Sequence, residues 1–407
     1  MTQPNKGLLS FEDAFAKVTD VSPIEDVDTV ALHEAYGRVV AQPVIAKLTQ
    51  PPHAVSAMDG YAVIANDTED ANAPLQVVAH IAAGDAPKAR IERGQAARIF
   101  TGAPVPRGAD AVLIQENTIS VSDKTIQVTQ PVKGGANIRS RGLDFENGHE
   151  ILKPGTKLST AALSLAAAAS VPKLDVRRRP RVGILSTGNE LVPPGETPRD
   201  GQIIASNAVG IAALIENTGA HAFDLGLARD DAKDIQNAIE HAKTMNLDAL
   251  VTLGGASVGD HDLVKPTLEA MGAQMNFWRV AVRPGKPIMY GKLNGMRLLG
   301  LPGNPVSSLV CAHLFLRPLL NALAGLPSNL PFQQAKLTKD CPANGARRHF
   351  MRAQSVWTRS GERLVSPIGS LDSSLLTKLT EADCLINVAP NTPEMGVGSV
   401  VTVLPLL

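Results

Sequence analysis

The feature that most constrains this fold is a repeated strand, loop and helix pattern that begins at Arg181. Apolar runs such as RVGIL and DALVTL alternate with longer segments whose apolar residues recur at helical spacing, such as DDAKDIQNAIEHAKTM. This alternation is typical of parallel α/β structure, in which helices cover the faces of a sheet. We therefore predict an α/β domain with a parallel-rich sheet in this part of the chain.

The segments on either side have a different texture. Short β-like runs, including LQVVAHIAA, AARIF and TIQVTQ, follow residue 51, and similar runs recur beyond residue 326. Helical spacing is present in SFEDAFAKVTD, where Ser10 has the position of an N-cap, in residues 29–39 and in TAALSLAAAAS. We interpret the basic junction VRRRPR as a solvated linker in preference to an anion site.

Composition and charge argue against several classes of function. Lys+Arg and Asp+Glu number 39 each, so no net charge favours nucleic acid or an anionic membrane, and aromatics make up only 3% of the residues. The three cysteines lie far apart, which argues against disulfides and cysteine zinc sites. Because we find neither a signal peptide nor an apolar run long enough to span a membrane, we expect a cytoplasmic protein that binds neither nucleic acid nor membrane.

Three polar loops follow predicted strand ends in the α/β domain. They are STGNEL (186–191), ARDDAKD (228–234) and GGASVGDHD (254–262). Ligands of open parallel sheets lie beyond the carboxyl ends of the strands, so these loops can form one site. The glycine loop matches neither a Walker A motif nor a dinucleotide-binding fingerprint, and alone it is also compatible with a tight strand-to-helix turn.

Acidic residues in these loops have two interpretations. Pro266 cannot lie deep inside a helix, so the helix after the glycine loop should begin near Asp262 or Leu263. Asp262 is then either an N-cap or a ligand, and Asp230 and Asp231 have the same two interpretations before their own helix.

Cations in the same domain point to an anionic ligand. RVAVRPGKP supplies Arg279, Arg283 and Lys286, and GLPGNPVSS places Asn304 before a helix whose free N–H groups favour an anion. Cations on an ordinary surface loop are the alternative interpretation. Carboxylates that suit a hard cation such as Mg²⁺ come from the three loops: Glu190, Asp230 and Asp262.

Seven motifs in this order resemble those of the MoeA-type molybdopterin molybdenumtransferases, the family that includes the gephyrin E-domain. They are PPHAVSAMDGYAV, TGAPVPRGADAV, IRSRGLDF, STGNEL, GGASVGDHD, RPGKP and GLPGNPVS, and the resemblance covers nearly the whole chain. It implies four domains: an elongated domain from residues 1–45 and 143–177, an inserted β-rich domain of 46–142, an α/β molybdopterin-binding domain of 178–326 and a C-terminal β-barrel of 327–407. It also implies a homodimer whose site is shared between the α/β domain of one subunit and the β-rich domain of the other.

The implied reaction inserts molybdate into the dithiolene of adenylylated molybdopterin, with release of AMP and dependence on Mg²⁺. The pterin supplies soft sulfur ligands, so the protein needs no cysteine or histidine cluster. The resemblance further implies transient contact with the molybdopterin adenylyltransferase. Two alternatives are a non-catalytic scaffold or paralogue of the family, and a nucleotide pyrophosphatase that uses the shared α/β domain.

Motif matching assigns the site residues. The catalytic set is Asp59, Asp144, Glu190 and Asp262, with Asp59 and Asp144 contributed by the partner subunit, and the metal ligands are Glu190, Asp230 and Asp262. Substrate-binding positions are Thr101, Ser186, Thr187, Gly188, Gly254, Gly255, Ser257 and Pro302. Positions associated with oxyanion binding are Arg283, Lys286, Ser307, Arg347 and Ser370.

This sequence departs from the family pattern at two places. Asn189 stands where many relatives carry aspartate, so a metal role for STGNEL must rest on Glu190. Arginine occupies positions 279 and 283, where lysine is common, and arginine still binds an oxyanion through paired N–H groups.

Overall fold

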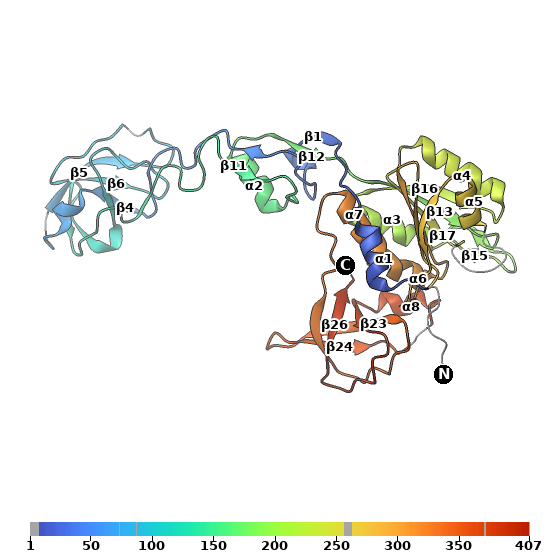
Figure 1. Cartoon of the computed structure of the whole chain (residues 1–407). Coiled ribbons are helices and arrows are strands. Elements are labelled where there is room, and N and C mark those ends of the chain that lie inside the picture. The colour runs from blue at the N-terminus through green and yellow to red at the C-terminus, as the bar shows by residue number, and fades with distance from the viewer. Residues whose placement is uncertain (1–7, 73, 87, 256–262, 370–371, 407) are drawn as a thin grey trace. The chain divides into compact units, whose positions relative to one another are not determined.

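The computed structural model describes residues 8–72, 74–86, 88–255, 263–369 and 372–406. The chain forms two compact units (Figure 1): Met1–Asp28 with Arg177–Leu407, and Thr29–Val176. Strands β1 (Val27–Ala31) and β12 (Lys173–Arg177), where the chain passes from one unit to the other, pair with each other.

A six-stranded sheet lies at the centre of the larger unit. Its order is β16 (His221–Ala228), β13 (Arg181–Thr187), β17 (Ala249–Leu253), β21 (Met296–Leu301), β20 (Met289–Leu293) and β18 (Gln274–Trp278). The first four strands are parallel, and the last two are antiparallel to their neighbours. The predicted parallel-rich α/β fold is therefore confirmed, and the carboxyl ends of β13, β17 and β21 lie along one edge.

Helices cover both faces of this sheet because side chains alternate along each strand. Val182 and Ile184 of β13 belong to a core cluster with α3 (Asn207–Asn217), and the next residue, Leu185, belongs to a cluster with α4 (Ala232–Thr244) and α5 (Val264–Ala270). A small parallel pair, β14 (Leu191–Val192) and β15 (Ile203–Ile204), lies between β13 and α3 in the chain.

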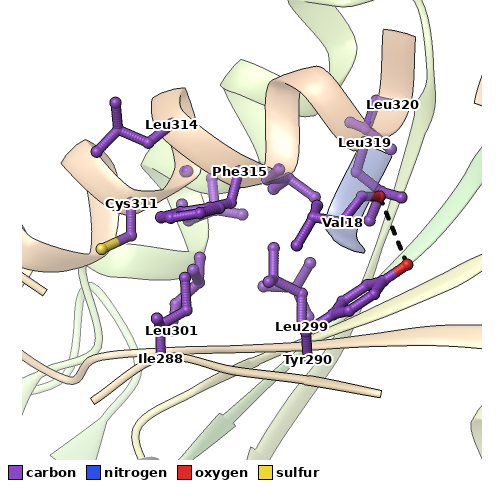
Figure 2. Packing of buried hydrophobic residues seen from close by; sticks show 14 of the residues in the cluster. Val18, Ile288, Tyr290, Leu299, Leu301, Cys311, Leu314, Phe315, Leu319 and Leu320 are labelled. Carbon is purple, nitrogen blue, oxygen red and sulfur yellow. Dashed lines mark hydrogen bonds between the residues drawn. The ribbon is translucent and has the colours of Figure 1, made fainter. Parts of the chain in front are cut away.

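The face covered by α3 also packs against the longest helical run. It consists of α6 (Pro305–Cys311), the π-helical turn η4 (Ala312–Leu316) and α7 (Arg317–Leu323). Figure 2 shows Phe315 and neighbouring helix residues facing Leu299 and Leu301 of β21. The run of 19 residues is long and apolar enough to cross a membrane, but 78% of its most apolar window is buried in the fold.

Helix α1 (Phe11–Thr19) joins this core. Ser10 caps it as predicted, because its side-chain oxygen accepts a hydrogen bond from the Asp13 backbone N–H at 3.0 Å. The Tyr290 hydroxyl donates to the Val18 carbonyl at 3.5 Å (Figure 2).

The C-terminal strands form the predicted closed barrel. The order is β23 (Arg348–Trp357), β24 (Arg363–Pro367), β22 (Gln333–Leu337), β26 (Val400–Pro405) and β25 (Cys384–Val388), and β25 pairs back onto β23. A short strand, β19 (Val282–Arg283), runs parallel to the start of β23, and the short helix α8 (Leu376–Thr380) precedes β25. Because β19 follows β18 in the chain, this pairing fixes Arg283 of β19 beside the barrel strand β23.

The smaller unit is rich in β-structure, as predicted. Its six-stranded sheet has the order β7 (Ala111–Ile114), β4 (Gly60–Val63), β6 (Gln95–Ile99), β5 (Pro74–Ile81), β9 (Thr125–Val128) and β8 (Thr118–Ser122). Outside the sheet lie the pairs β3 (Val55–Ser56) with β10 (Ile138–Arg139) and β2 (Val44–Ile45) with β11 (Glu150–Leu152), the 3₁₀ turns η2 (Ala65–Thr68) and η3 (Gln115–Asn117), and helix α2 (Thr160–Ala168). The four-domain division at the stated boundaries stays a prediction.

Residues 29–39 do not form the predicted helix. They contain the end of β1 and the single 3₁₀ turn η1 (Leu32–Glu34). The Thr29 hydroxyl donates to Asp175 Oδ1 at 2.6 Å, which ties this segment to β12. Pairing with a distant strand overrides the local helical spacing.

The interpretation of the basic junction as a solvated linker is wrong for Arg178. Its guanidinium donates two hydrogen bonds to the carboxylate of Asp248, both of 2.9 Å, and a third of 2.9 Å to Asp26. These bonds raise the pKa of Arg178 despite its partial burial. The junction is therefore a structural joint that fixes the start of β13.

Candidate functional site

A pocket of about 740 Å³ lies beyond the carboxyl ends of β13, β17 and β21. This volume falls within the range of about 300–1,000 Å³ that is typical of small-molecule sites. The structure brings eight predicted site residues together in its lining: Ser186, Thr187, Gly188, Glu190, Asp230, Gly254, Gly255 and Pro302. The topology explains this convergence, because parallel neighbouring strands end at the same edge.

Glycine is required at the end of β17 for close packing of the loops. Gly254 has φ +91°, and a Cβ there would lie 2.6 Å from the Thr187 carbonyl oxygen. Gly255 has φ +61°, and a Cβ there would lie 2.1 Å from Val264 Cγ2. The interpretation of these two glycines as a tight turn is thus correct. The turn also places their backbone in the wall of the pocket.

The Thr187 hydroxyl is a buried polar group without a partner. The residue is 4% exposed, and its Oγ1 has no hydrogen-bond partner among the described residues. This oxygen is 3.2 Å and 3.1 Å from the points where Cβ atoms of Gly254 and Gly255 would lie. An unpaired buried hydroxyl costs about 1–3 kcal/mol, so a ligand in the pocket that pairs with it gains affinity.

The two aspartates before α4 have different tasks. Asp231 is the N-cap, and its Oδ1 accepts from the backbone N–H groups of Lys233 at 2.9 Å and Asp234 at 3.1 Å. Asp230 lines the pocket, and its carboxylate accepts from the Asn189 N–H at 3.2 Å. The capping interpretation therefore holds for Asp231, and Asp230 is left as a carboxylate at the pocket.

Two described carboxylates, Glu190 and Asp230, line the pocket. Mg²⁺ is commonly held by one or two carboxylates together with substrate phosphates and water, so this pair fits an Mg²⁺ shared with a phosphate ligand. No group of three or more His, Cys, Asp or Glu residues that could hold a metal occurs within the described ranges. The predicted residues Ser257 and Asp262 lie outside those ranges, and Leu263 holds the N-cap position of α5.

Two of the predicted oxyanion residues, Arg283 and Arg347, belong to a basic cluster where β19 meets β23. Arg283 lines a small cavity of about 20 Å³, and the half-buried Arg347 donates to the Val282 carbonyl at 3.4 Å. Burial, reinforced by Arg283, lowers the pKa of Arg347. Lys286 is exposed and Ser307 is buried in the first turn of α6, whereas Ser370 lies outside the described residues.

In the smaller unit, Asp59 and Thr101 form a hydrogen-bonded pair. Gly60 and Ile99 are partners in the antiparallel β4–β6 ladder, so the residues just beyond them meet. The Thr101 backbone N–H and hydroxyl both donate to Asp59 Oδ1 at 2.8 Å. These two bonds, with a smaller contribution from Arg98, lower the pKa of Asp59 and keep it ionised.

Arg98 supports this pair from β6. Its guanidinium donates to the Gly60 carbonyl at 3.0 Å and lies over the rings of Tyr61, at 5.1 Å, and Phe100, at 4.9 Å. A Cβ on Gly60 would lie 2.1 Å from the Leu113 carbonyl oxygen, so glycine is required beside Asp59. The exposed carboxylate is thus held by a rigid surround.

Asp144 lies elsewhere in the smaller unit. It lines a cavity of about 560 Å³ together with Arg139 and a rim of Pro51, Pro52 and Pro104. Asp59 is not among the residues that line this cavity.

Several pocket residues were not predicted from the sequence. Residues 203–207 line the pocket where β15 leads into α3, and Asn207 donates from Nδ2 to the Gly303 carbonyl at 2.7 Å. Ser374 and Leu376 line it from beyond the α/β segment. For residues 203–207, the polar helix start at Ser206 and Asn207 is the one feature of the sequence that could have indicated a site. The positions of Ser374 and Leu376 depend on how the barrel packs.

Three family models match successive parts of the chain. The MoeA N-terminal region (domain I and II) matches residues 9–170, a probable molybdopterin binding domain matches 183–322, and the MoeA C-terminal region (domain IV) matches 334–406. The crystal structure of the molybdopterin biosynthesis moeA protein from Pyrococcus horikoshii superposes with a TM-score of 0.85 at 27% identity, covering 98% of this chain and 100% of that chain.

Curated relatives match over the same length. The molybdopterin molybdenumtransferase of Haemophilus influenzae is 33% identical over 98% of this chain and 98% of its own. That of Bacillus subtilis is 32% identical over 97% of this chain and 93% of its own. With family models over most of its residues and relatives that match it from end to end, the chain belongs to the MoeA family.

Proposed function

We propose that this chain is a molybdopterin molybdenumtransferase that inserts molybdate into the dithiolene of adenylylated molybdopterin and releases AMP. The main observation behind this proposal is the pocket at the strand ends. Its lining brings together the Thr187 hydroxyl, which is buried and unpaired among the described residues, the backbone of two glycines and two carboxylates. These residues lie in the segment matched by the probable molybdopterin binding domain. The names of the full-length relatives support the same activity. The two alternatives, a scaffold and a pyrophosphatase, have no such support.

The chemistry divides between two groups of residues. The pocket binds the nucleotide-linked pterin, with Thr187 and the backbone of Gly254 as hydrogen-bonding groups. The cations Arg283, Lys286 and Arg347 attract molybdate, because guanidinium and ammonium groups bind oxyanions through charge-assisted hydrogen bonds. The two pterin thiols form Mo–S bonds while one molybdate oxygen leaves as water. A water molecule cleaves the phosphoanhydride, so that AMP departs and a phosphate stays on the pterin.

Mg²⁺ at Glu190 and Asp230 would offset phosphate charge when bound. Asp230→Asn should raise the Mg²⁺ concentration for half-maximal rate by about 10-fold or more, since loss of a carboxylate ligand removes charge from the site. Asp231→Asn is the matched control, because asparagine also caps helices. An equal response of the two variants would remove Asp230 from the metal site.

The active site is proposed to be completed by a second copy of the chain, which supplies Asp59 and Asp144. Support comes from the firmly held Asp59, because two hydrogen bonds from Thr101 and the nearby charge of Arg98 lower its pKa and keep it ionised. Mixing Asp59→Ala with Glu190→Ala protein should restore partial activity in heterodimers. No recovery despite demonstrated subunit exchange would place the site within one chain.

The proposed reaction is tested with purified protein in buffer that contains millimolar Mg²⁺, as in the cytoplasm where we expect the protein to act. Adenylylated molybdopterin is supplied, either directly or by the molybdopterin adenylyltransferase that we propose as a transient partner, and AMP is measured with and without molybdate. AMP release that requires molybdate supports the transferase. Release at the same rate without molybdate would favour a pyrophosphatase, and no release would favour a scaffold.

A further inference from the structure

A buried histidine that the sequence did not single out lies within the basic cluster. His349 is on β23 and is 6% exposed. In the parallel β19–β23 pair it is the register partner of Arg283. Arg347 lies in the bend just before β23, and its guanidinium donates to the carbonyl of Val282, the residue before Arg283, at 3.4 Å. The two predicted oxyanion arginines therefore flank this imidazole.

The His349 side chain lacks a partner and lines a cavity. Within the described part of the chain its imidazole has no hydrogen-bond partner. It lines the cavity of about 20 Å³ together with Arg283, Arg352 and Ser373. Such a volume holds about one water-sized atom, which corresponds to one oxygen of a tetrahedral oxyanion and not to the whole ion. A buried imidazole beside such a space should pair with whatever occupies it.

Charge determines what the imidazole can offer. Burial first, and then Arg283, Arg347 and Arg352, lower the pKa of His349 to about 4. At neutral pH the ring is therefore uncharged and carries one N–H donor. Three guanidinium groups around it favour an anion in the cavity, and a neutral donor adds a hydrogen bond to that anion without a further buried charge.

We propose that His349 donates a hydrogen bond to one oxygen of the oxyanion bound by Arg283 and Arg347, and that this bond helps set the affinity for molybdate. The proposal rests on the proposed function, which supplies the oxyanion. The same chemistry would also accept a phosphate oxygen of the nucleotide, so the experiment must separate these two sources.

The test compares His349→Phe, which fills the space without a donor, with His349→Asn and His349→Gln, which place an amide N–H near the position of Nδ1 or Nε2. Molybdate-dependent AMP release gives KM for molybdate and for adenylylated molybdopterin separately. We expect His349→Phe to raise the molybdate KM about 10-fold, with little change in the pterin KM, and one amide variant to stay within about 3-fold of wild type. His241→Phe, on the exposed side of α4, is the control for a histidine substitution.

Calorimetric titration of sodium molybdate into the same full-length proteins keeps this test independent of turnover. Wild-type protein that binds molybdate but releases no AMP would contradict the proposed reaction and leave the His349 comparison measurable. A folded His349→Phe protein with unchanged molybdate affinity would show that the cavity holds only water and overturn the inference. A rise confined to the KM for adenylylated molybdopterin would place the imidazole at the nucleotide phosphate and overturn the molybdate assignment. If the His349→Phe protein fails to fold, His349→Leu takes its place.

Discussion

Replacing Thr187 by valine should make the ligand-free protein more stable and should raise the KM for adenylylated molybdopterin. The Thr187 hydroxyl is buried, unpaired among the described residues and part of the pocket wall. A stability gain is expected because valine has nearly the same shape and removes a polar group whose burial costs about 1–3 kcal/mol. A binding loss is expected because the substrate loses its hydrogen-bond partner.

The two effects have estimable sizes. If the hydroxyl relaxes partly in the free protein, Thr187→Val gains about 1 kcal/mol of stability. A hydrogen bond to the bound pterin or phosphate contributes about 1–2 kcal/mol, so its loss raises KM about 5- to 30-fold. The assays are thermal unfolding of ligand-free protein and the KM for adenylylated molybdopterin in the AMP-release reaction.

Thr252 provides an internal control. Its hydroxyl is also buried without a described partner, at 2% exposure, but it is not among the residues that line the pocket. Thr252→Val should therefore raise stability similarly and leave KM unchanged. Wild-type KM in Thr187→Val protein, or an equal KM change in both variants, would refute the assignment of Thr187 to the substrate.

Two further predictions concern a charged pair and a packing contact. Thr101→Val removes one of two hydrogen bonds to Asp59, so the pKa of Asp59 should rise toward its ordinary value. The acid limb of the pH–rate profile should then move to higher pH. Carbon NMR of labelled aspartate measures the pKa, and an unchanged pKa would contradict the role of the hydroxyl. Gly285→Ala places a Cβ 2.0 Å from Cys311 Sγ at φ +102°, which should cost about 2–4 kcal/mol in urea unfolding. Gly295→Ala, at φ +95° with open space, should cost only about 1 kcal/mol, and equal losses would show that the Cys311 contact is unimportant.

The pocket was predictable because its determinants are local. Strand runs ending in polar loops indicate a parallel sheet, and parallel topology alone places Ser186, Gly254 and Pro302 at one edge. Local pattern did not decide between Asp230 and Asp231 as the cap. That choice depends on the extended backbone at Asp231 (φ −135°, ψ 130°), which only the folded chain shows.

Contacts between distant segments were not predictable from pattern. The Asp59–Thr101 bond depends on the register of β4 with β6, and the position of His349 beside Arg283 depends on a two-residue parallel pairing. Residues 29–39 show the same limit, since their helical spacing yields to pairing of β1 with β12. Eight residues named by family motifs line one pocket, and the structure adds hydrogen bonds that hold two of the predicted carboxylates, Asp59 and Asp230.

The most direct test of the central claim is a mass balance in a single turnover. Full-length protein is mixed with adenylylated molybdopterin, Mg²⁺ and molybdate, and AMP and pterin-bound molybdenum are counted by mass spectrometry in the same sample. The account predicts about one pterin-bound molybdenum for each AMP, and little of either product when molybdate is omitted. AMP formed without molybdenum on the pterin would contradict the claim that this chain transfers the metal.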